Sequence, residues 1–185
     1  CVFILSWLIP ILWVLVKLES KGPLIFKQKR EGLNVEHFVC YKFRSMRSNE
    51  NSDKVHARKD DERVTKIGAF MRRTSIDELP QLINVFKGDM SFIGPRPFIY
   101  EYMHVYTDTE KRRHDVRPGV SGWAQVNGRN SISWKEKFKL DLYYVDNISL
   151  YIDIKILFLT LLKVFKTSDI NQKSNMTMEK YNGKN

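Results

Sequence analysis

Residues 1–16 read CVFILSWLIPILWVLV, an apolar run without a charged side chain that ends at Lys17 and Glu19. As a helix, this run would extend about 24 Å at ~1.5 Å per residue. A bilayer core is about 30 Å thick and requires roughly 20 apolar residues, so the run is too short to cross it upright. Pro10 lies near the centre and removes a backbone hydrogen bond from a helix interior. These features are compatible with a kinked helix that enters one leaflet and turns back.

Three other interpretations of this run stay open: a truncated spanning helix, the core of a signal peptide, or a buried helix of a soluble domain. A signal peptide is disfavoured because no small-residue cleavage site follows; the next residues, 18–21, are LESK. The chain begins at Cys1 and not at Met, so we expect further residues upstream.

The composition narrows the kinds of partner. The chain has 185 residues, which is enough for one domain with a hydrophobic core. Its 31 basic and 21 acidic residues give a net charge of +10, which favours anionic partners such as nucleic acid, nucleotides or lipid phosphates. Two cysteines, Cys1 and Cys40, cannot build a disulfide framework or a cysteine metal site. The histidines, at positions 37, 56, 104 and 114, show no metal-ligand spacing.

Apolar periodicity and turn residues predict a mostly helical chain. Helices are expected at residues 67–73, 78–87, 98–114, 133–145 and 148–166. A strand is expected at 38–43, and loops are expected at 47–63, 89–97 and 117–129. The last helix is apolar nearly all round, so it lies either in a core or along a membrane surface. The polar tail after it is expected to be loosely held.

The sharpest local feature is TSIDELP, residues 74–80, which places Asp77 beside Glu78 where a helix is expected to begin. One interpretation is structural: Ser75 and Glu78 fit a capping box, or Asp77 is the N-cap with Pro80 in the first turn. The other is chemical. A helix N-terminus suits a phosphate, a carboxylate can attack phosphorus, and two carboxylates can hold Mg²⁺ together with phosphate oxygens and water.

A second feature is arginine beside glycine and proline. The pattern recurs in GPRP (94–97), RPG (117–119) and GR (128–129), and Arg72 precedes the acidic pair. Arginine forks match phosphate oxygens, and glycine lets a backbone approach a ligand closely. For any single arginine, a solvated surface position is the alternative. The chain has no G-x-x-x-x-G-K-[ST] and no G-x-G-x-x-G, which argues against P-loop and Rossmann chemistry.

Four motifs in this order resemble the bacterial sugar transferase family, the small monotopic phosphoglycosyl transferases that begin glycan assembly. They are YKFRSM (41–46), SIDELPQ (75–81), GDMSFIGPRP (88–97) and RPGVSGWAQVNGR (117–129). The resemblance extends from about residue 1 to residue 166 and is highly specific when the motifs are taken together.

The resemblance implies a reaction and a site. Asp77 would attack the β-phosphate of a UDP-sugar, release UMP and form a phosphosugar–aspartate intermediate that passes its group to undecaprenyl phosphate. Glu78 would assist, and both carboxylates would help to place Mg²⁺. The implied contacts with phosphate and uridine come from four basic residues: Lys42, Arg72, Arg96 and Arg129. Asp141 matches a further polar position that the family uses near the site.

The resemblance also implies an α-rich α+β fold at the cytoplasmic face of the bacterial inner membrane. Residues 1–19 would form a re-entrant helix–break–helix, 20–166 a compact catalytic domain with amphipathic interfacial helices, and 167–185 a polar tail. Family members commonly have Ser-Pro at the break, whereas this chain has Ile9-Pro10. The hydroxyl that would satisfy a freed backbone group in lipid is therefore missing at this position.

The expected partners are a UDP-sugar, undecaprenyl phosphate and inner-membrane lipid, with downstream glycosyltransferases as further candidates and no nucleic acid. Two other functions compete. A basic nucleic-acid-binding module leaves residues 1–16 unexplained, and a non-catalytic membrane scaffold predicts no effect of Asp77→Asn. The sugar stays open among diacetylbacillosamine, GalNAc and GlcNAc. The ending TMEKYNGKN (177–185) resembles members that start N-linked protein glycosylation and favours the first.

Overall fold

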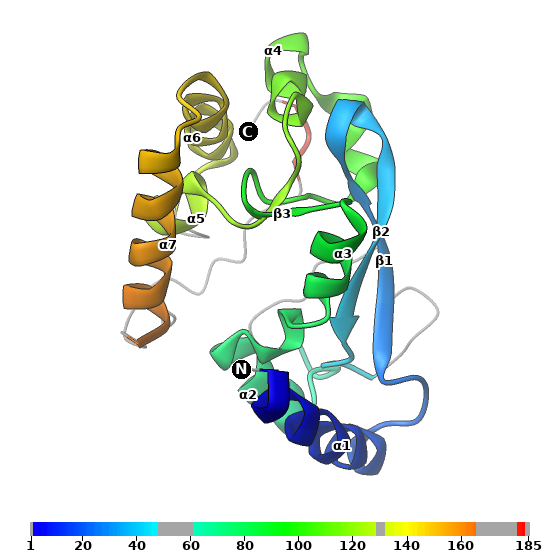
Figure 1. Cartoon of the computed structure of the whole chain (residues 1–185). Coiled ribbons are helices and arrows are strands. Elements are labelled where there is room, and N and C mark those ends of the chain that lie inside the picture. The colour runs from blue at the N-terminus through cyan, green and yellow to red at the C-terminus, as the bar shows by residue number, and fades with distance from the viewer. Residues whose placement is uncertain (1, 48–60, 129–131, 166–180, 184–185) are drawn as a thin grey trace. The chain divides into compact units, whose positions relative to one another are not determined.

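The computed structural model describes residues 2–47, 61–128, 132–165 and 181–183. The chain divides into two compact units. The first comprises Cys1–Lys27 and Tyr41–Pro80, and the second comprises Gln28–Cys40 and Gln81–Asn185. Strands β1 (Ile25–Glu31) and β2 (His37–Phe43) pair in a two-stranded sheet and contribute residues to both units (Figure 1).

The first unit is built around helices α1 (Val2–Glu19) and α2 (Lys66–Thr74), followed by the short 3-10 turn η2 (Ile76–Glu78). Leu12 and Val16 lie one helical turn apart on α1, and both are buried in a cluster with Phe43 and Met71. This contact places α1 against α2. The neighbouring side chains Ile11, Trp13 and Leu18 on α1 are exposed.

Helix α1 runs through Pro10 without interruption. The predicted break between two helical segments is therefore not observed, and the re-entrant placement in a membrane stays a prediction. Among the residues that the structure describes, no helix combines the length and the apolar character needed to cross a membrane.

The second unit contains α3 (Gln81–Lys87) and a pair of short parallel strands, β3 (Ser91–Ile93) and β4 (Gly119–Ser121). Ser91 pairs with Gly119, and Ile93 pairs with Ser121. A Cβ atom at Gly119 would lie 2.1 Å from the backbone nitrogen of Gly94. These glycines therefore permit two backbones to approach each other, whereas the sequence suggested that they make room for a ligand.

The remaining helical elements of the second unit follow in chain order. They are η1 (Leu33–Val35), η3 (Tyr100–Val105), α4 (Asp108–Lys111), η4 (Arg112–His114), α5 (Trp123–Asn127), α6 (Trp134–Asp146) and α7 (Leu150–Phe165). An aromatic cluster packs η3 against α6 through six buried side chains: Ile99, Tyr102, Tyr106, Trp134, Phe138 and Tyr181. A second cluster packs α5 and α6 against α7 through Val126, Tyr144, Ile152 and Ile156.

These elements confirm the expectation of a helix-rich chain with little sheet. The helices predicted at 67–73, 133–145 and 148–166 are observed as α2, α6 and α7. The loop predicted at 117–129 was wrong in part, because it contains β4 and α5. The helix predicted at 98–114 is instead three short helical pieces. In the tail, Tyr181 is buried in the aromatic cluster, which corrects the expectation of a loosely held segment at that residue.

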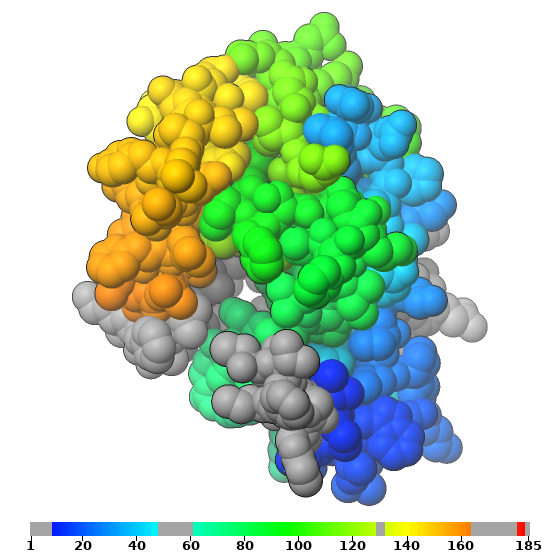
Figure 2. Space-filling view, in the orientation of Figure 1, coloured from blue at the N-terminus to red at the C-terminus, as the bar shows by residue number. Residues whose placement is uncertain are grey.

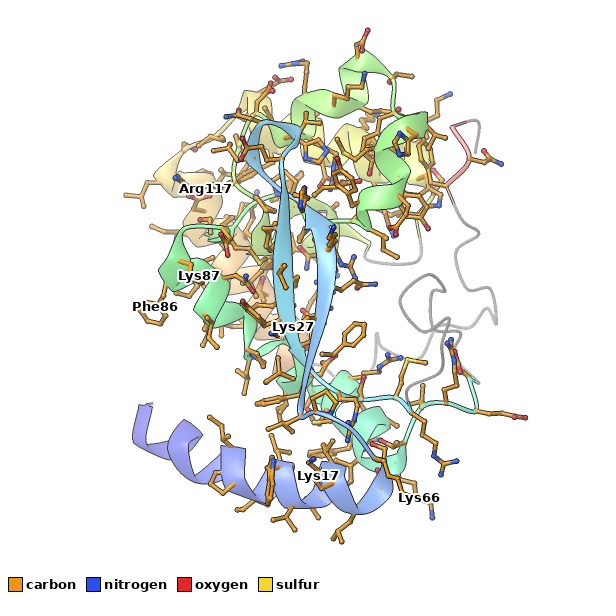
Figure 3. The ribbon with its side chains drawn as sticks, turned by 90° about the vertical axis from the view of Figure 1, so that its right-hand side faces the viewer. Lys17, Lys27, Lys66, Phe86, Lys87 and Arg117 are labelled. Carbon is orange, nitrogen blue, oxygen red and sulfur yellow. The ribbon has the colours of Figure 1, made fainter. Side chains whose placement is uncertain are left out.

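One face of helix α7 is buried in the core and the rest is exposed, and its placement along a membrane surface stays a prediction. Ile152 and Ile156 are buried, whereas apolar side chains on the rest of the helix are exposed, and Figure 2 shows α7 at the surface of the second unit. The most exposed are Leu150, Tyr151, Ile154, Leu157, Phe158, Leu161 and Leu162. On α3, Phe86 is 91% exposed and points away from its helix (Figure 3).

Candidate functional site

The acidic pair lies directly after a sharp end of helix α2. Ser75 adopts a left-handed conformation with φ 58°, which stops α2 and starts the 3-10 turn that contains Asp77 and Glu78. The Ser75 side chain makes no capping hydrogen bond there. The capping box proposed for Ser75 and Glu78 was therefore wrong.

Glu78 forms an ion pair with Lys42, a residue of strand β2. The Nζ atom of Lys42 donates to Oε1 of Glu78 at 2.9 Å, and the two side chains are 18% and 17% exposed. The structure thus joins two predicted site residues that are 36 positions apart in the chain. The ion pair is therefore only partly exposed to solvent.

Asp77 is 9% exposed and lies within electrostatic reach of Arg72. The Nε atom of Arg72 donates to Oγ of Ser45 at 2.8 Å, which ties the end of α2 to the segment after β2. Burial lowers the pKa of Arg72, while the negative charges of Asp77, Asp61 and Glu78 oppose that shift. An arginine side chain stays protonated in proteins, so Arg72 places a fixed positive charge near the Asp77 carboxylate.

The acidic pair was also predicted to hold Mg²⁺. Within the described ranges, no group of three or more histidine, cysteine, aspartate or glutamate side chains is arranged to hold a metal ion. Asp77 and Glu78 nevertheless fit a magnesium ion chemically, because this ion often takes one or two protein carboxylates and completes its shell with phosphate and water.

The second unit places Arg96 in the loop between β3 and η3. Its neighbours Gly94, Pro95 and Pro97 are buried, whereas Arg96 itself is half-buried. Arg129, the other arginine predicted to contact the donor, lies outside the described residues. Arg117 donates from Nε to the carbonyl oxygen of Gly88 at 2.9 Å, so part of its donor capacity is used within the protein (Figure 3).

Asp141 is deeply buried and ion-paired. Its Oδ2 atom accepts from Nη2 of Arg113 at 2.9 Å, and Oε2 of Glu31 accepts from Nη1 of the same arginine at 2.8 Å. We call Glu31, Arg113 and Asp141 the buried ion cluster. The side chains of all three are at most 2% exposed. The structure therefore holds Asp141 in an internal ion pair, and the substrate contact that the resemblance implied stays a prediction.

Sequence reasoning missed Glu31 and Arg113 altogether. Burial raises the pKa of Glu31 to about 7, although Arg113 and the hydroxyl of Tyr106 favour its ionised form. Burial also raises the pKa of Asp141, opposed by Arg113. For both carboxyl groups, burial outweighs the nearby positive charges, which are Arg113 and Arg30 for Glu31 and Arg113 and Lys137 for Asp141.

Comparison of the sequence with known proteins identifies the family of this chain. The profile of the family described as "Bacterial sugar transferase" matches residues 1–167. The chain is 49% identical over 168 residues to "Uncharacterized sugar transferase EpsL" of Bacillus subtilis (strain 168), covering 91% of this chain and 83% of that protein. It is 48% identical over 160 residues to "UDP-glucose:undecaprenyl-phosphate glucose-1-phosphate transferase" of Escherichia coli (strain K12), covering 81% of this chain and 34% of that protein.

A third relative carries a different sugar in its name. The chain is 46% identical over 156 residues to "UDP-N-acetylgalactosamine-undecaprenyl-phosphate N-acetylgalactosaminephosphotransferase" of Aeromonas hydrophila, covering 80% of this chain and 37% of that protein. The chain thus spans most of the Bacillus protein but about a third of the length of the other two. Since the family profile matches nearly the whole chain, the protein belongs to the bacterial sugar transferase family.

Proposed function

We propose that this protein transfers a sugar-1-phosphate from a UDP-sugar to undecaprenyl phosphate and releases UMP. The observation that carries the proposal is its identity of 46–48% with relatives whose names describe this reaction for UDP-glucose and UDP-N-acetylgalactosamine. The aligned part of those relatives has about the length of this chain. The acidic pair and the arginines near it supply groups that suit a diphosphate substrate.

The reaction has two displacement steps on one phosphorus atom. In the first, an Oδ atom of Asp77 attacks the β-phosphorus, and the bond from that phosphorus to the bridging oxygen breaks, so that UMP leaves with the electron pair. In the second, an oxygen of undecaprenyl phosphate attacks the same phosphorus, and the bond to Asp77 breaks to restore the carboxylate. The fixed charge of Arg72 near Asp77 favours the ionised, nucleophilic form of that carboxylate.

The other predicted residues have supporting roles in this proposal. Lys42 holds Glu78 through the 2.9 Å ion pair, and Glu78 assists Asp77. Asp77 and Glu78 are the residues that would hold Mg²⁺, which when bound offsets negative charge on the diphosphate. Arg96 and Arg129 are assigned to donor phosphate and uridine contacts, since arginine forks match phosphate oxygens.

Membrane association is part of the proposal, because one substrate is a long lipid with a phosphate headgroup. The exposed apolar side chains of α7 and the exposed face of α1 suit contact with lipid. The net charge of +10 suits an anionic surface such as the cytoplasmic leaflet of a bacterial inner membrane. We retain N-acetylated sugars as the first donors to test, with glucose and galactose beside them.

The reaction is tested on protein in nanodiscs with undecaprenyl phosphate, Mg²⁺ and a panel of UDP-sugars, with UMP as the readout. We expect UMP from one or a few donors and none from the Asp77→Asn variant. A second assay omits undecaprenyl phosphate and follows exchange of labelled UMP into the UDP-sugar. Exchange is expected only if a covalent intermediate forms. UMP release that survives Asp77→Asn refutes the assignment of the nucleophile, and no UMP from any donor refutes the reaction.

A further inference from the structure

The loop from Gly94 to Phe98 is held by a backbone hydrogen bond at each of its five residues. The nitrogen of Gly94 donates to Ser121, and the carbonyl oxygens of the next four residues accept. Their donors are, in order, the nitrogen of Gly119, Nη2 of Arg113, Nη1 of Arg30 and the nitrogen of Glu31, at 3.0, 2.6, 3.1 and 3.2 Å. These bonds fix the backbone of the loop at Arg96, which is partly exposed, as is Phe98.

The bond at Arg96 depends on a side chain instead of a neighbouring strand. The guanidinium of Arg113 donates through Nη2 to the Arg96 carbonyl and lies 4.1 Å from the ring centroid of Phe98. Its remaining donors meet the two acidic members of the buried ion cluster, Glu31 and Asp141. Glu31 and Asp141 therefore orient Arg113 from two sides, and Arg113 in turn holds the loop through the carbonyl oxygen of Arg96.

Stability alone is a weak reason for such a cluster. Buried ion pairs lose hydration that their mutual attraction often only balances, and apolar residues of similar volume can replace them without loss of stability. A guanidinium held by two carboxylates, however, has a defined orientation that an apolar side chain cannot reproduce. The described contacts show what that orientation serves, because they aim one donor at the Arg96 carbonyl.

We propose that Glu31, Arg113 and Asp141 are positioning residues that hold the Arg96 loop in the orientation in which its guanidinium receives the phosphate of the nucleotide-sugar donor. This inference rests on the proposed function, in which Arg96 contacts the donor. Orientation of a phosphate-binding fork affects chiefly the binding of the donor, so the Michaelis constant for the UDP-sugar is the sensitive quantity.

The variants for the test are Arg113→Gln and, in the adjacent position, Arg112→Gln as a matched control. Arg112 is exposed and pairs at the surface with Asp146. In the full-length protein in nanodiscs, we expect Arg113→Gln to raise KM for the UDP-sugar about tenfold with a smaller change in kcat, and Arg112→Gln to leave both unchanged. If Arg113→Gln does not fold, Asp141→Asn takes its place, since asparagine retains an acceptor for the arginine.

A double-mutant cycle separates positioning from general damage. In an Arg96→Ala background, Arg113→Gln is expected to change KM less than twofold, because the group that it positions is gone. Equal factors in both backgrounds would overturn the inference, as would an unchanged KM in Arg96→Ala alone.

Amide hydrogen exchange supplies a readout that does not need activity. We expect Arg113→Gln to speed exchange at Gly94, Arg96 and Phe98, and Arg112→Gln to leave these amides as in the wild type. Unchanged exchange in Arg113→Gln overturns the inference even if the enzyme is active. Conversely, a wild-type protein that releases no UMP refutes the proposed function, while exchange still reports whether the cluster holds the loop.

Discussion

Replacing Glu31 with glutamine should make the free energy of unfolding fall more steeply with falling pH than it does in the wild type. Two buried groups meet at this point: Nε2 of His114 lies 3.4 Å from Oε2 of Glu31. Burial raises the pKa of Glu31 from 4.5 to about 7. Burial, together with the charge of Arg113, lowers the pKa of His114 from 6.5 to about 3. The two shifts have opposite effects on stability over a shared range of pH.

The signs follow from which state binds the proton. As the pH falls from about 7 to 4.5, Glu31 is protonated in the folded protein first, so folding becomes more favourable. As the pH falls from 6.5 towards 3, His114 is protonated in the unfolded chain first, so folding becomes less favourable. Between pH 4.5 and 6.5 each group contributes about 1.4 kcal/mol per pH unit, and the two contributions cancel.

Glu31→Gln removes the contribution of Glu31 to the pH dependence of stability and leaves that of His114. The free energy of unfolding of the variant, relative to the wild type, is expected to fall by about 3 kcal/mol between pH 6.5 and 4.5, which is two pH units at about 1.4 kcal/mol each. The assay is urea denaturation followed by tryptophan fluorescence at pH 4.5, 5.5 and 6.5. Glu101→Gln, an exposed position on η3, is the control and should parallel the wild type. A variant profile parallel to that of the wild type would refute this account of the cluster.

Three further substitutions test other parts of the structure. Gly68→Ala places a Cβ 1.9 Å from the carbonyl oxygen of Ser45, so we expect a loss of about 3 kcal/mol in urea denaturation, and an unchanged midpoint would contradict that packing. Lys42→Met removes the cation from its glutamate partner and should lower kcat for UMP release at least about tenfold, with partial recovery in Lys42→Arg. Tyr181→Phe removes a hydroxyl that donates to Glu110 at 2.7 Å and should lower the unfolding free energy by about 1 kcal/mol; no loss would show that this bond contributes nothing.

Local signals in the sequence predicted helices α6 and α7. The apolar pattern of residues 148–166 predicted α7, and Ser133 begins α6 as an N-cap whose hydroxyl accepts from the nitrogen of Glu136 at 3.2 Å. The strand β4 and the helix α5 within 117–129 were missed because they are only three and five residues long. Elements this short have no detectable period, and the pairing of β4 with β3 is a tertiary contact.

In the candidate site, too, local motifs identified some residues, whereas residues joined only by tertiary contacts were missed. The acidic pair and Lys42 were identified from motifs, and the structure brings Glu78 and Lys42 together. The buried ion cluster was not identifiable, because Glu31 and Arg113 are 82 positions apart and neither belongs to a quoted motif. Glu31 follows Lys27 and Lys29 at alternate positions of strand β1. This pattern of charged residues gives no sign that Glu31 is fully buried. Such a contact depends on the three-dimensional fold and not on local sequence.

The separation within the cluster has a consequence during synthesis on the ribosome. Residues 28–40 of the second unit are made before most of the first unit, and Glu31 precedes its arginine partner by 82 residues. At about 5–20 residues per second, Glu31 waits roughly 4–16 seconds for that partner. A carboxylate without its cation stays in water. The end of strand β1 at Glu31 therefore cannot be buried while the chain is growing through the first unit. The second unit is therefore expected to close late, after residue 141 has left the exit tunnel.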